Sequence, residues 1–240
     1  MSASIDQVLQ DAVANGAVPN VVAMAADRDG IVYEGAAGPR VGGEDEPVAP
    51  DTHFRIMSMT KMVATVAALQ QMEQGRLELD APIDTYCPQF ADLQVLDGFD
   101  GDEPRLRAPA SRATIKQLIT HTTGLGYWFW NAGLVRWESA TGTPNVLSGS
   151  NVIFTAPLLA DPGTTYEYGI NTDWLGKVVE AVSGVALDVA IKEGITGPLG
   201  MDETTFIMSP EQRATSTPIH LQSEDGAWAA SGVDLNQGPE

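Results

Sequence analysis

The segment from Arg55 to Leu69 contains a serine and a lysine whose spacing could support nucleophilic catalysis. Ser58 and Lys61 are three positions apart, so on a helix their side chains share one face. The residues that follow are mostly apolar, which predicts a helix buried inside the protein. Burial lowers the pKa of a lysine, and such a lysine beside a hydroxyl can act as a general base that makes the serine a nucleophile. Because Ser-x-x-Lys also occurs by chance in helices, this pair alone does not separate catalysis from an ordinary helix face.

An aromatic cluster, Tyr127-Trp-Phe-Trp130, is the second feature with chemical potential. Such a cluster usually belongs to a hydrophobic core. It can also form the apolar wall of a substrate pocket, which makes Tyr127, Trp128 and Phe129 candidate substrate-binding residues. Tyr168, further along the chain, follows a turn at Asp161-Pro-Gly163 and precedes a helix with apolar residues on one side.

Composition excludes several classes of function. The 240 residues carry a net charge of −19, which repels nucleic acid and anionic membranes. The three histidines lie far apart without metal-ligand spacing, so we expect neither a metal nor another cofactor. No apolar run is long enough for a membrane helix, no secretory signal is visible, and the single cysteine, Cys87, excludes an internal disulfide. These features predict a cytoplasmic protein.

The elements that must position these residues follow from local signals. Ser4 and Gln7 fit a capping box at the start of a first helix, and Thr114 and Gln117 fit a second one. The other expected elements are a β-hairpin of residues 21–26 and 31–36, a loop over 39–51, the Ser58 helix ending near Gly75, a surface excursion over 97–113, a helix from Leu187 to Glu193, and weak strands at 217–221 and 228–233.

Four motifs in this order resemble those of the serine β-lactamase and penicillin-binding-protein superfamily. They are Ser58-Met-Thr-Lys61, His121-Thr-Thr-Gly-Leu125, Pro162-Gly163 followed by Tyr168, and Gly197-Pro-Leu-Gly-Met201. Within the superfamily, the chain is most similar to the class C β-lactamase-like carboxylesterases, often called family VIII esterases. The resemblance implies an α/β (α+β) fold, in which an antiparallel sheet is flanked by helices and joined to a mainly helical lobe. It divides the chain into residues 1–57 of the sheet domain, a helical lobe over 58–205, and a return to the sheet domain over 206–240.

The resemblance also implies roles for individual residues. Ser58 would be the acylated nucleophile, and its backbone N–H would supply half of an oxyanion hole. Lys61 would be the base or proton relay, and Tyr168 would exchange protons with Ser58 and the leaving group. Asn171 becomes a candidate substrate-binding residue, although it lies one position after the family's asparagine, where this chain has Ile170.

Two departures from the family pattern shape the functional prediction. Ile170 replaces an amide that would bind a β-lactam side chain, and no third motif follows residue 171. The sequence therefore predicts a serine carboxylesterase acting on small to medium acyl esters. The alternatives are a β-lactamase or D-alanyl-D-alanine peptidase, and a non-catalytic binding protein on the same fold. Because family members are longer, we also expect a complementing C-terminal polypeptide to complete the sheet.

Overall fold

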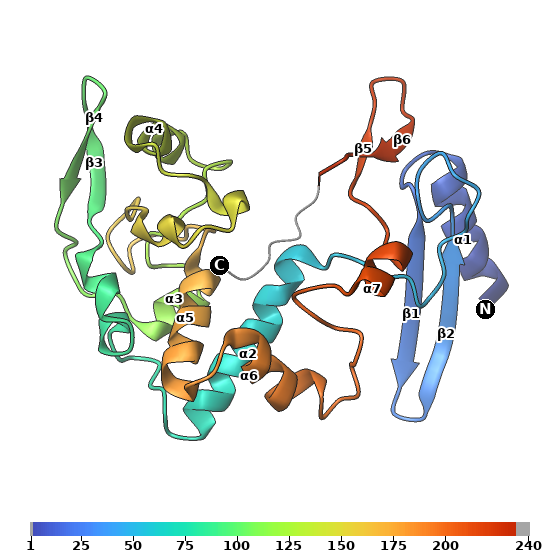
Figure 1. Ribbon diagram of the computed structural model, residues 1–240, viewed down its shortest axis with the longest axis horizontal. Coiled ribbons are helices and arrows are strands. Elements are labelled where there is room, and N and C mark those ends of the chain that lie inside the picture. Colours follow the sequence, from blue (N-terminus) through green and yellow to red (C-terminus); the bar gives the residue numbers. More distant parts are fainter. Residues whose placement is uncertain (1, 234–240) are drawn as a thin grey trace. The chain divides into compact units, whose positions relative to one another are not determined.

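A computed structural model describes residues 2–233, and residues 234–240 of the predicted return segment lie outside this description. The chain divides into two units (Figure 1). Of the described residues, one unit contains 2–57 and 207–233, and the other contains Ser58–Phe206. Among the described residues, no helix is both long and apolar enough to cross a membrane.

The first unit is built on the predicted hairpin. Strands β1 (Val21–Asp27) and β2 (Gly30–Ala37) pair antiparallel, and helix α1 (Ser2–Ala14) packs against β2. The Tyr33 hydroxyl of β2 donates a hydrogen bond to the Asp6 carboxylate of α1 over 2.8 Å. Because α1 already begins at Ser2, Ser4 lies within the helix, and the predicted capping box at Ser4 is wrong.

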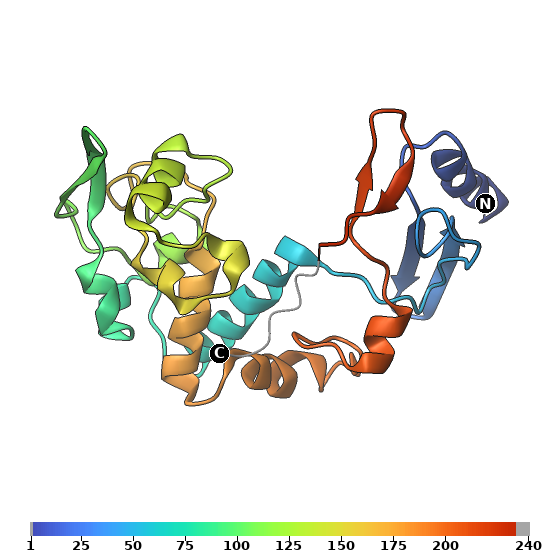
Figure 2. The same cartoon turned by 45° about the horizontal axis from the view of Figure 1, so that its top comes forward.

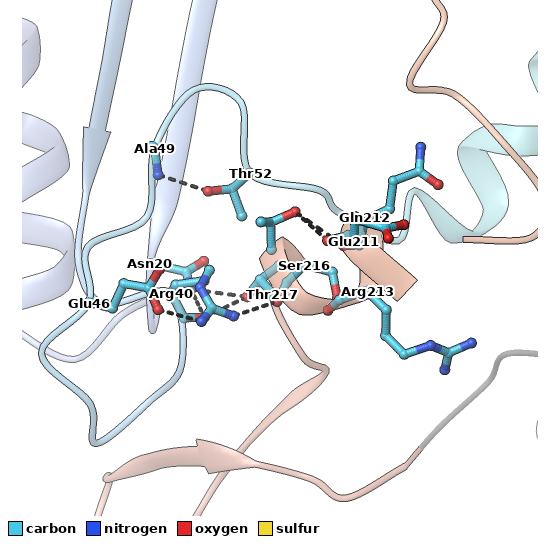
Figure 3. A network of polar contacts seen from close by, with 11 residues as sticks. Asn20, Arg40, Glu46, Ala49, Thr52, Glu211, Gln212, Arg213, Ser216 and Thr217 are labelled. Atoms are coloured by element: carbon cyan, nitrogen blue, oxygen red, sulfur yellow. Dashed lines mark hydrogen bonds and ion pairs between the residues drawn. The ribbon is translucent and has the colours of Figure 1, made fainter. Parts of the chain in front are cut away.

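The segment after Ile207 returns to this unit through polar contacts (Figure 3). The Arg40 guanidinium donates to the Ser216 carbonyl over 3.0 Å, and the Thr217 hydroxyl donates to the Arg40 carbonyl over 2.9 Å. The Thr217 hydroxyl also accepts a hydrogen bond from the Asn20 amide over 3.3 Å. Helix α7 (Pro210–Thr215) precedes these contacts, and the short antiparallel pair β5 (His220–Gln222) and β6 (Trp228–Ala230) follows them.

The second unit is mainly helical and contains the largest core. Helix α2 (Thr60–Glu73) lies beside α5 (Asn171–Ser183), and Trp174, Leu175, Val178 and Val179 of α5 are buried (Figure 2). The other α-helices described in this unit are α3 (Ile115–Ile119), α4 (Ala132–Thr141) and α6 (Leu187–Ile191), which continues into a π-helical turn over Lys192–Thr196. Short 3₁₀ turns span Met57–Met59, Ile83–Thr85, Pro88–Asp92, Val146–Ser148 and Asn151–Thr155.

Two features of this unit differ from the sequence prediction. Residues predicted as a surface excursion include an antiparallel hairpin of β3 (Val95–Asp100) and β4 (Glu103–Arg107), whose register shifts between Leu96 and Phe99. Helix α2 is buried on only one face: Ala64, Ala67 and Ala68 are covered, whereas the Met62 side chain is 71% exposed. Nothing among the described residues covers the face that carries Met62.

Candidate functional site

Ser58 and Lys61 are brought together by a change of helix type. Ser58 lies in the 3₁₀ turn Met57–Met59, and α2 begins directly after it. The Lys61 ammonium donates a hydrogen bond to the Ser58 hydroxyl over 3.3 Å. Ser58 is exposed and Lys61 is half-buried, so the hydroxyl can be reached from solvent while the amine is shielded. Met57, immediately before Ser58, has a φ of 47°, a backbone conformation that is unfavourable for a side chain other than glycine.

Tyr127 provides the second hydrogen-bond partner of Lys61. The Lys61 ammonium lies 3.0 Å from the Tyr127 hydroxyl, and the Tyr127 side chain is only 7% exposed. The sequence predicted a substrate-binding role for Tyr127. In the structure its hydroxyl oxygen instead accepts a hydrogen bond from Lys61.

Tyr168 lies against the same lysine, which it contacts through its aromatic ring and not through its hydroxyl. The Lys61 nitrogen is 5.1 Å from the centroid of the Tyr168 ring and 5.3 Å from that of the Tyr127 ring, and both rings can attract a cation. The two rings meet edge to face, with centroids 5.6 Å apart. Within residues 2–233, no hydrogen bond joins the Tyr168 hydroxyl to Ser58 or Lys61. The structure thus brings all three predicted catalytic side chains together, with Tyr168 in contact through its aromatic face.

The protonation of Lys61 differs from the sequence prediction. Burial lowers the pKa of Lys61, but the hydrogen bond to Tyr127 and the charges that Tyr127, Tyr168 and Asp173 can carry raise it, and the net shift is upward. The expectation of a lowered lysine pKa is therefore wrong, because partners distant in sequence outweigh the desolvation. At neutral pH the resting lysine is an ammonium ion.

The loops that carry the two tyrosines are held by backbone contacts. The amide of Glu167 donates to the His121 carbonyl over 2.8 Å, and the amide of Leu159 donates to the Gly124 carbonyl over 2.7 Å. At Gly169, next to Tyr168, a Cβ atom would lie 2.3 Å from the Leu125 carbonyl oxygen. Only glycine permits this close approach, which brings the Tyr168 loop up to the Tyr127 loop.

Asn171 fastens the same two loops and is not available to a substrate. Its side chain is fully buried. The side-chain amide donates to the carbonyls of Leu125 and Glu167 over 3.0 and 3.1 Å, and its oxygen accepts from the Thr123 hydroxyl. The prediction that Asn171 binds substrate is therefore corrected: its hydrogen-bonding groups are used within the protein.

The remaining aromatic candidates differ in exposure. Phe129 is 47% exposed and stacks on Tyr127, with centroids 4.9 Å apart, so it lies open to solvent beside the site. Trp128 is half-buried, and its indole nitrogen is buried without a hydrogen-bond partner. Trp128 lines a cavity of about 10 Å³ together with Glu138 and the apolar side chains of Leu134 and Trp137. A cavity of this volume is at the lower limit for a single water molecule and is too small for an acyl group.

His121 is a neighbour of the site, and the sequence indicated it only as part of the His121-Thr-Thr-Gly-Leu125 motif. Its ring lies 4.8 Å from the Tyr168 ring, between centroids, and its φ of 54° is unusual for a residue with a side chain. Burial, followed by the charge of Lys61, lowers the pKa of His121 to about 4. Its Nδ1 atom is buried without a partner. The signal in the sequence was the histidine before Thr122-Thr-Gly124, where a helix stops.

The lowered pKa of His121 predicts a pH dependence of stability. Because the folded state resists protonation, the unfolded chain binds more protons between pH 6.5 and about 4, and stability falls as the pH falls through this window. Asparagine tolerates a positive φ, so it can replace His121. Over this pH window, the free energy of unfolding of His121→Asn should fall by about 1–2 kcal/mol less than that of the wild type. Urea unfolding at pH 7 and pH 4.5 would measure the difference, with His53→Asn as a control. Equal acid losses in the wild type and His121→Asn would contradict the prediction.

Comparison with known proteins identifies the family of this site. The beta-lactamase family model matches residues 5–238. The chain belongs to the beta-lactamase family. Its fold is β-lactamase-like. The structure resembles that of the unliganded simvastatin synthase of Aspergillus terreus with a TM-score of 0.85 and 32% sequence identity. The match covers 97% of this chain and 60% of that chain.

Curated relatives of this beta-lactamase family chain include esterases and acyltransferases. The lovastatin esterase of Penicillium rubens is 34% identical, over 95% of this chain and 59% of its own length. Esterase EstB of Burkholderia gladioli is 32% identical over 98% of this chain and 59% of its own length. The monacolin J acid methylbutanoyltransferase of Aspergillus terreus is 35% identical over 92% of this chain and 56% of its own length. The chain thus spans a little over half the length of these relatives.

Proposed function

We propose that this chain carries the acylation machinery of a serine carboxylesterase (EC 3.1.1.-) that acts on small to medium acyl esters. The observation that carries the proposal is a continuous hydrogen-bonded row, in which Lys61 contacts the Ser58 hydroxyl over 3.3 Å and the Tyr127 hydroxyl over 3.0 Å. A serine hydroxyl is a weak nucleophile at its own pKa, and an adjacent base is the usual means of activating it.

The proposed reaction passes through an acyl-enzyme. When Lys61 is neutral, it accepts the proton of Ser58 as the serine oxygen forms a bond to the ester carbonyl carbon. The bond from that carbon to the alcohol oxygen then breaks, and the departing oxygen takes a proton from the Lys61 ammonium or from a phenol. Water repeats the sequence on the acyl-enzyme and releases the acid. Tyr168 keeps its proposed role as a proton carrier, and Tyr127 shares that role because its hydroxyl is already bound to Lys61.

Two observations favour esters over β-lactams. Ile170 is buried at the position where the related β-lactamases have an asparagine, so no amide is available there for a lactam side chain. Relatives at 32–34% identity are named esterases. A β-lactamase or a D-alanyl-D-alanine peptidase is the alternative, because the matching family model is that of beta-lactamases.

Acyl transfer to an alcohol is the second candidate function. It is favoured by a relative named a methylbutanoyltransferase, which is 35% identical to this chain. Transfer and hydrolysis share the acyl-enzyme and differ only in whether an alcohol or water attacks it.

Parallel assays with p-nitrophenyl butyrate and nitrocefin test the proposal. We expect ester turnover to exceed nitrocefin turnover by at least about 100-fold, since Ile170 offers no hydrogen bond to a lactam amide and a missing polar partner weakens binding strongly. Addition of a simple alcohol would show transfer as a new ester product. Rapid nitrocefin hydrolysis without ester turnover would reverse the assignment.

We further propose that a complementing polypeptide contributes to the complete enzyme. The support is the length of the relatives, of which this chain matches 56–59%, and the pairing of the described strands in two-stranded sheets only. Isolated two-stranded pairs are marginal in water. The intact mass of purified material under denaturing conditions would reveal a companion polypeptide, whereas a folded, monomeric and fully active chain would refute its requirement.

A further inference from the structure

A groove of about 450 Å³ lies where the β3–β4 hairpin meets the start of α4, and the proposed reaction does not use it. Figure 1 shows the hairpin beside α4, and α4 packs against β4. The groove walls include three partly buried apolar side chains, Leu96 and Phe99 of β3 and Leu159. A volume of this size is within the range of sites that hold small molecules.

Small residues keep this groove open. The register of β3 shifts between Leu96 and Phe99, and Gly98 in this stretch has a φ of 98°, a conformation that favours glycine. Gly133, the second residue of α4, also lines the groove. A Cβ atom at Gly133 would lie 3.6 Å from the Leu96 side chain, so a larger residue there would narrow the space.

Arg136 of α4 is the one charged side chain among the described residues that line the groove. Its guanidinium carbon lies 4.1 Å from the centroid of the Phe99 ring, a distance at which the ring attracts a cation. Its Nη2 group also donates a hydrogen bond to the Gly101 carbonyl. Because Phe99 is itself part of the wall, these contacts hold the guanidinium at the groove.

The charge of Arg136 is only weakly balanced by the protein. The Asp102 carboxylate lies 3.6 Å from the Arg136 Nη2 atom, but the Asp102 side chain is fully exposed, and an exposed ion pair contributes little. Within residues 2–233, the Nε and Nη1 groups of Arg136 have no hydrogen-bond partner. The groove therefore combines apolar walls with a cation whose N–H groups are available to a ligand.

We propose that this groove binds a small apolar molecule that carries one carboxylate. The apolar part lies against Leu96, Phe99 and Leu159, and the carboxylate accepts hydrogen bonds from Arg136. A planar guanidinium matches the geometry of a carboxylate, and hydrogen bonds between ionised groups are stronger than neutral ones. The ligand displaces the exposed Asp102 carboxylate from Arg136. This binding site goes beyond the proposed function, since no step of the acyl transfer uses these residues.

A pair of probes that differ in charge tests the proposal. The probes are 1-naphthaleneacetate and its neutral analogue 1-naphthaleneacetamide, titrated into the ¹⁵N-labelled chain and followed by NMR. We expect both probes to shift the backbone amide signals of Gly98 and Gly133, and the carboxylate to bind about 10-fold more tightly than the amide. Equal affinities would overturn the proposal. Shifts around Ser58 in place of shifts at the two glycines would overturn it as well.

Substitution of the cation separates its contribution from that of the apolar walls. In Arg136→Gln, the preference for the carboxylate over the amide should disappear, while 1-naphthaleneacetamide should still bind. Arg28→Gln removes the same charge from a side chain that is 92% exposed and paired only with its neighbour Asp29, so it is the matched control and should keep the preference. A preference for the carboxylate that persists in Arg136→Gln would overturn the proposal.

Asp102→Asn provides a test that leaves Arg136 in place. Because Asp102 is fully exposed, its substitution should not disturb folding, and it removes the group that competes with the ligand. The affinity for 1-naphthaleneacetate should rise about 2- to 5-fold, the scale of an exposed ion pair. An affinity that does not rise would overturn the proposal. Failure of Ser58 to react with a fluorophosphonate would count against the esterase function alone, because these titrations do not depend on catalysis.

Discussion

Ser58→Ala is expected to abolish fluorophosphonate labelling and to lower p-nitrophenyl butyrate turnover by about 10⁴-fold or more, the size of effect seen when a serine nucleophile is removed. The reason is geometric. The Ser58 hydroxyl is the only oxygen that is both exposed and bound to Lys61 in the described site, since the Tyr127 hydroxyl is on a buried side chain.

The substitution should leave the fold intact. Ser58 is exposed, and its side chain makes one hydrogen bond, to Lys61, so its removal should change stability by less than about 1 kcal/mol. Thermal unfolding would check this. Ser139→Ala, on the exposed face of α4, is a matched control that should keep both labelling and turnover. Full ester turnover in Ser58→Ala would exclude the proposed acyl-enzyme.

The elements that sequence predicted best are those with complete local signals. Thr114 and Gln117 form the expected capping box, with the Thr114 hydroxyl accepting from the Gln117 amide and the Gln117 side chain accepting from the Thr114 amide. The hairpin of β1 and β2 turns at the expected glycine, Gly30. In both cases the residues that determine the structure lie within a few positions of one another, so a short window of sequence contains the information.

The β3–β4 hairpin was missed because its local signals contradict its structure. Pro104 lies within β4 and Gly98 within β3, and both residues are depleted in strands. The Arg107 guanidinium donates to the Asp161 carboxylate over 2.8 and 2.9 Å, and β3 continues into a bridge with Leu158. These contacts join segments more than 50 residues apart, and no local pattern reveals them.

The chemistry of the site also depends on contacts between segments that are distant in sequence. The spacing of Ser58 and Lys61 correctly predicted that their side chains lie on one face, as their 3.3 Å hydrogen bond shows. The sequence could not give the direction of the Lys61 pKa shift, because this depends on Tyr127, Tyr168 and Asp173, which reach the lysine only through the fold. Likewise, the carbonyl groups that accept hydrogen bonds from the Asn171 amide belong to Leu125 and Glu167, which lie in the Tyr127 and Tyr168 loops.

Lys61→Met is expected to lower the rate of Ser58 labelling by about 10²–10⁴-fold, the usual contribution of a general base. Methionine keeps much of the apolar stem against the Tyr127 and Tyr168 rings but cannot accept a proton. Because the half-buried ammonium pays a desolvation cost, its removal should leave stability within about 1 kcal/mol of the wild type. Measuring the labelling rate by intact mass between pH 6 and pH 10 would separate this effect from turnover.

Lys177→Met is a close control for Lys61→Met. Its ammonium also lies against an aromatic ring, 5.6 Å from the centroid of Phe154, but it forms an ion pair with Glu180 over 3.4 Å. Loss of labelling in Lys61→Met alone would assign the effect to the row of Ser58, Lys61 and Tyr127.

Combining Lys61→Met with Tyr127→Phe tests whether the phenol acts through the lysine. The second substitution should lower the labelling rate by less than about 3-fold further, because the effects of residues that act as a unit are not additive. An unchanged labelling rate in Lys61→Met would show that Ser58 is activated by another group, and Tyr168→Phe in the same background would test whether that group is the phenol of Tyr168.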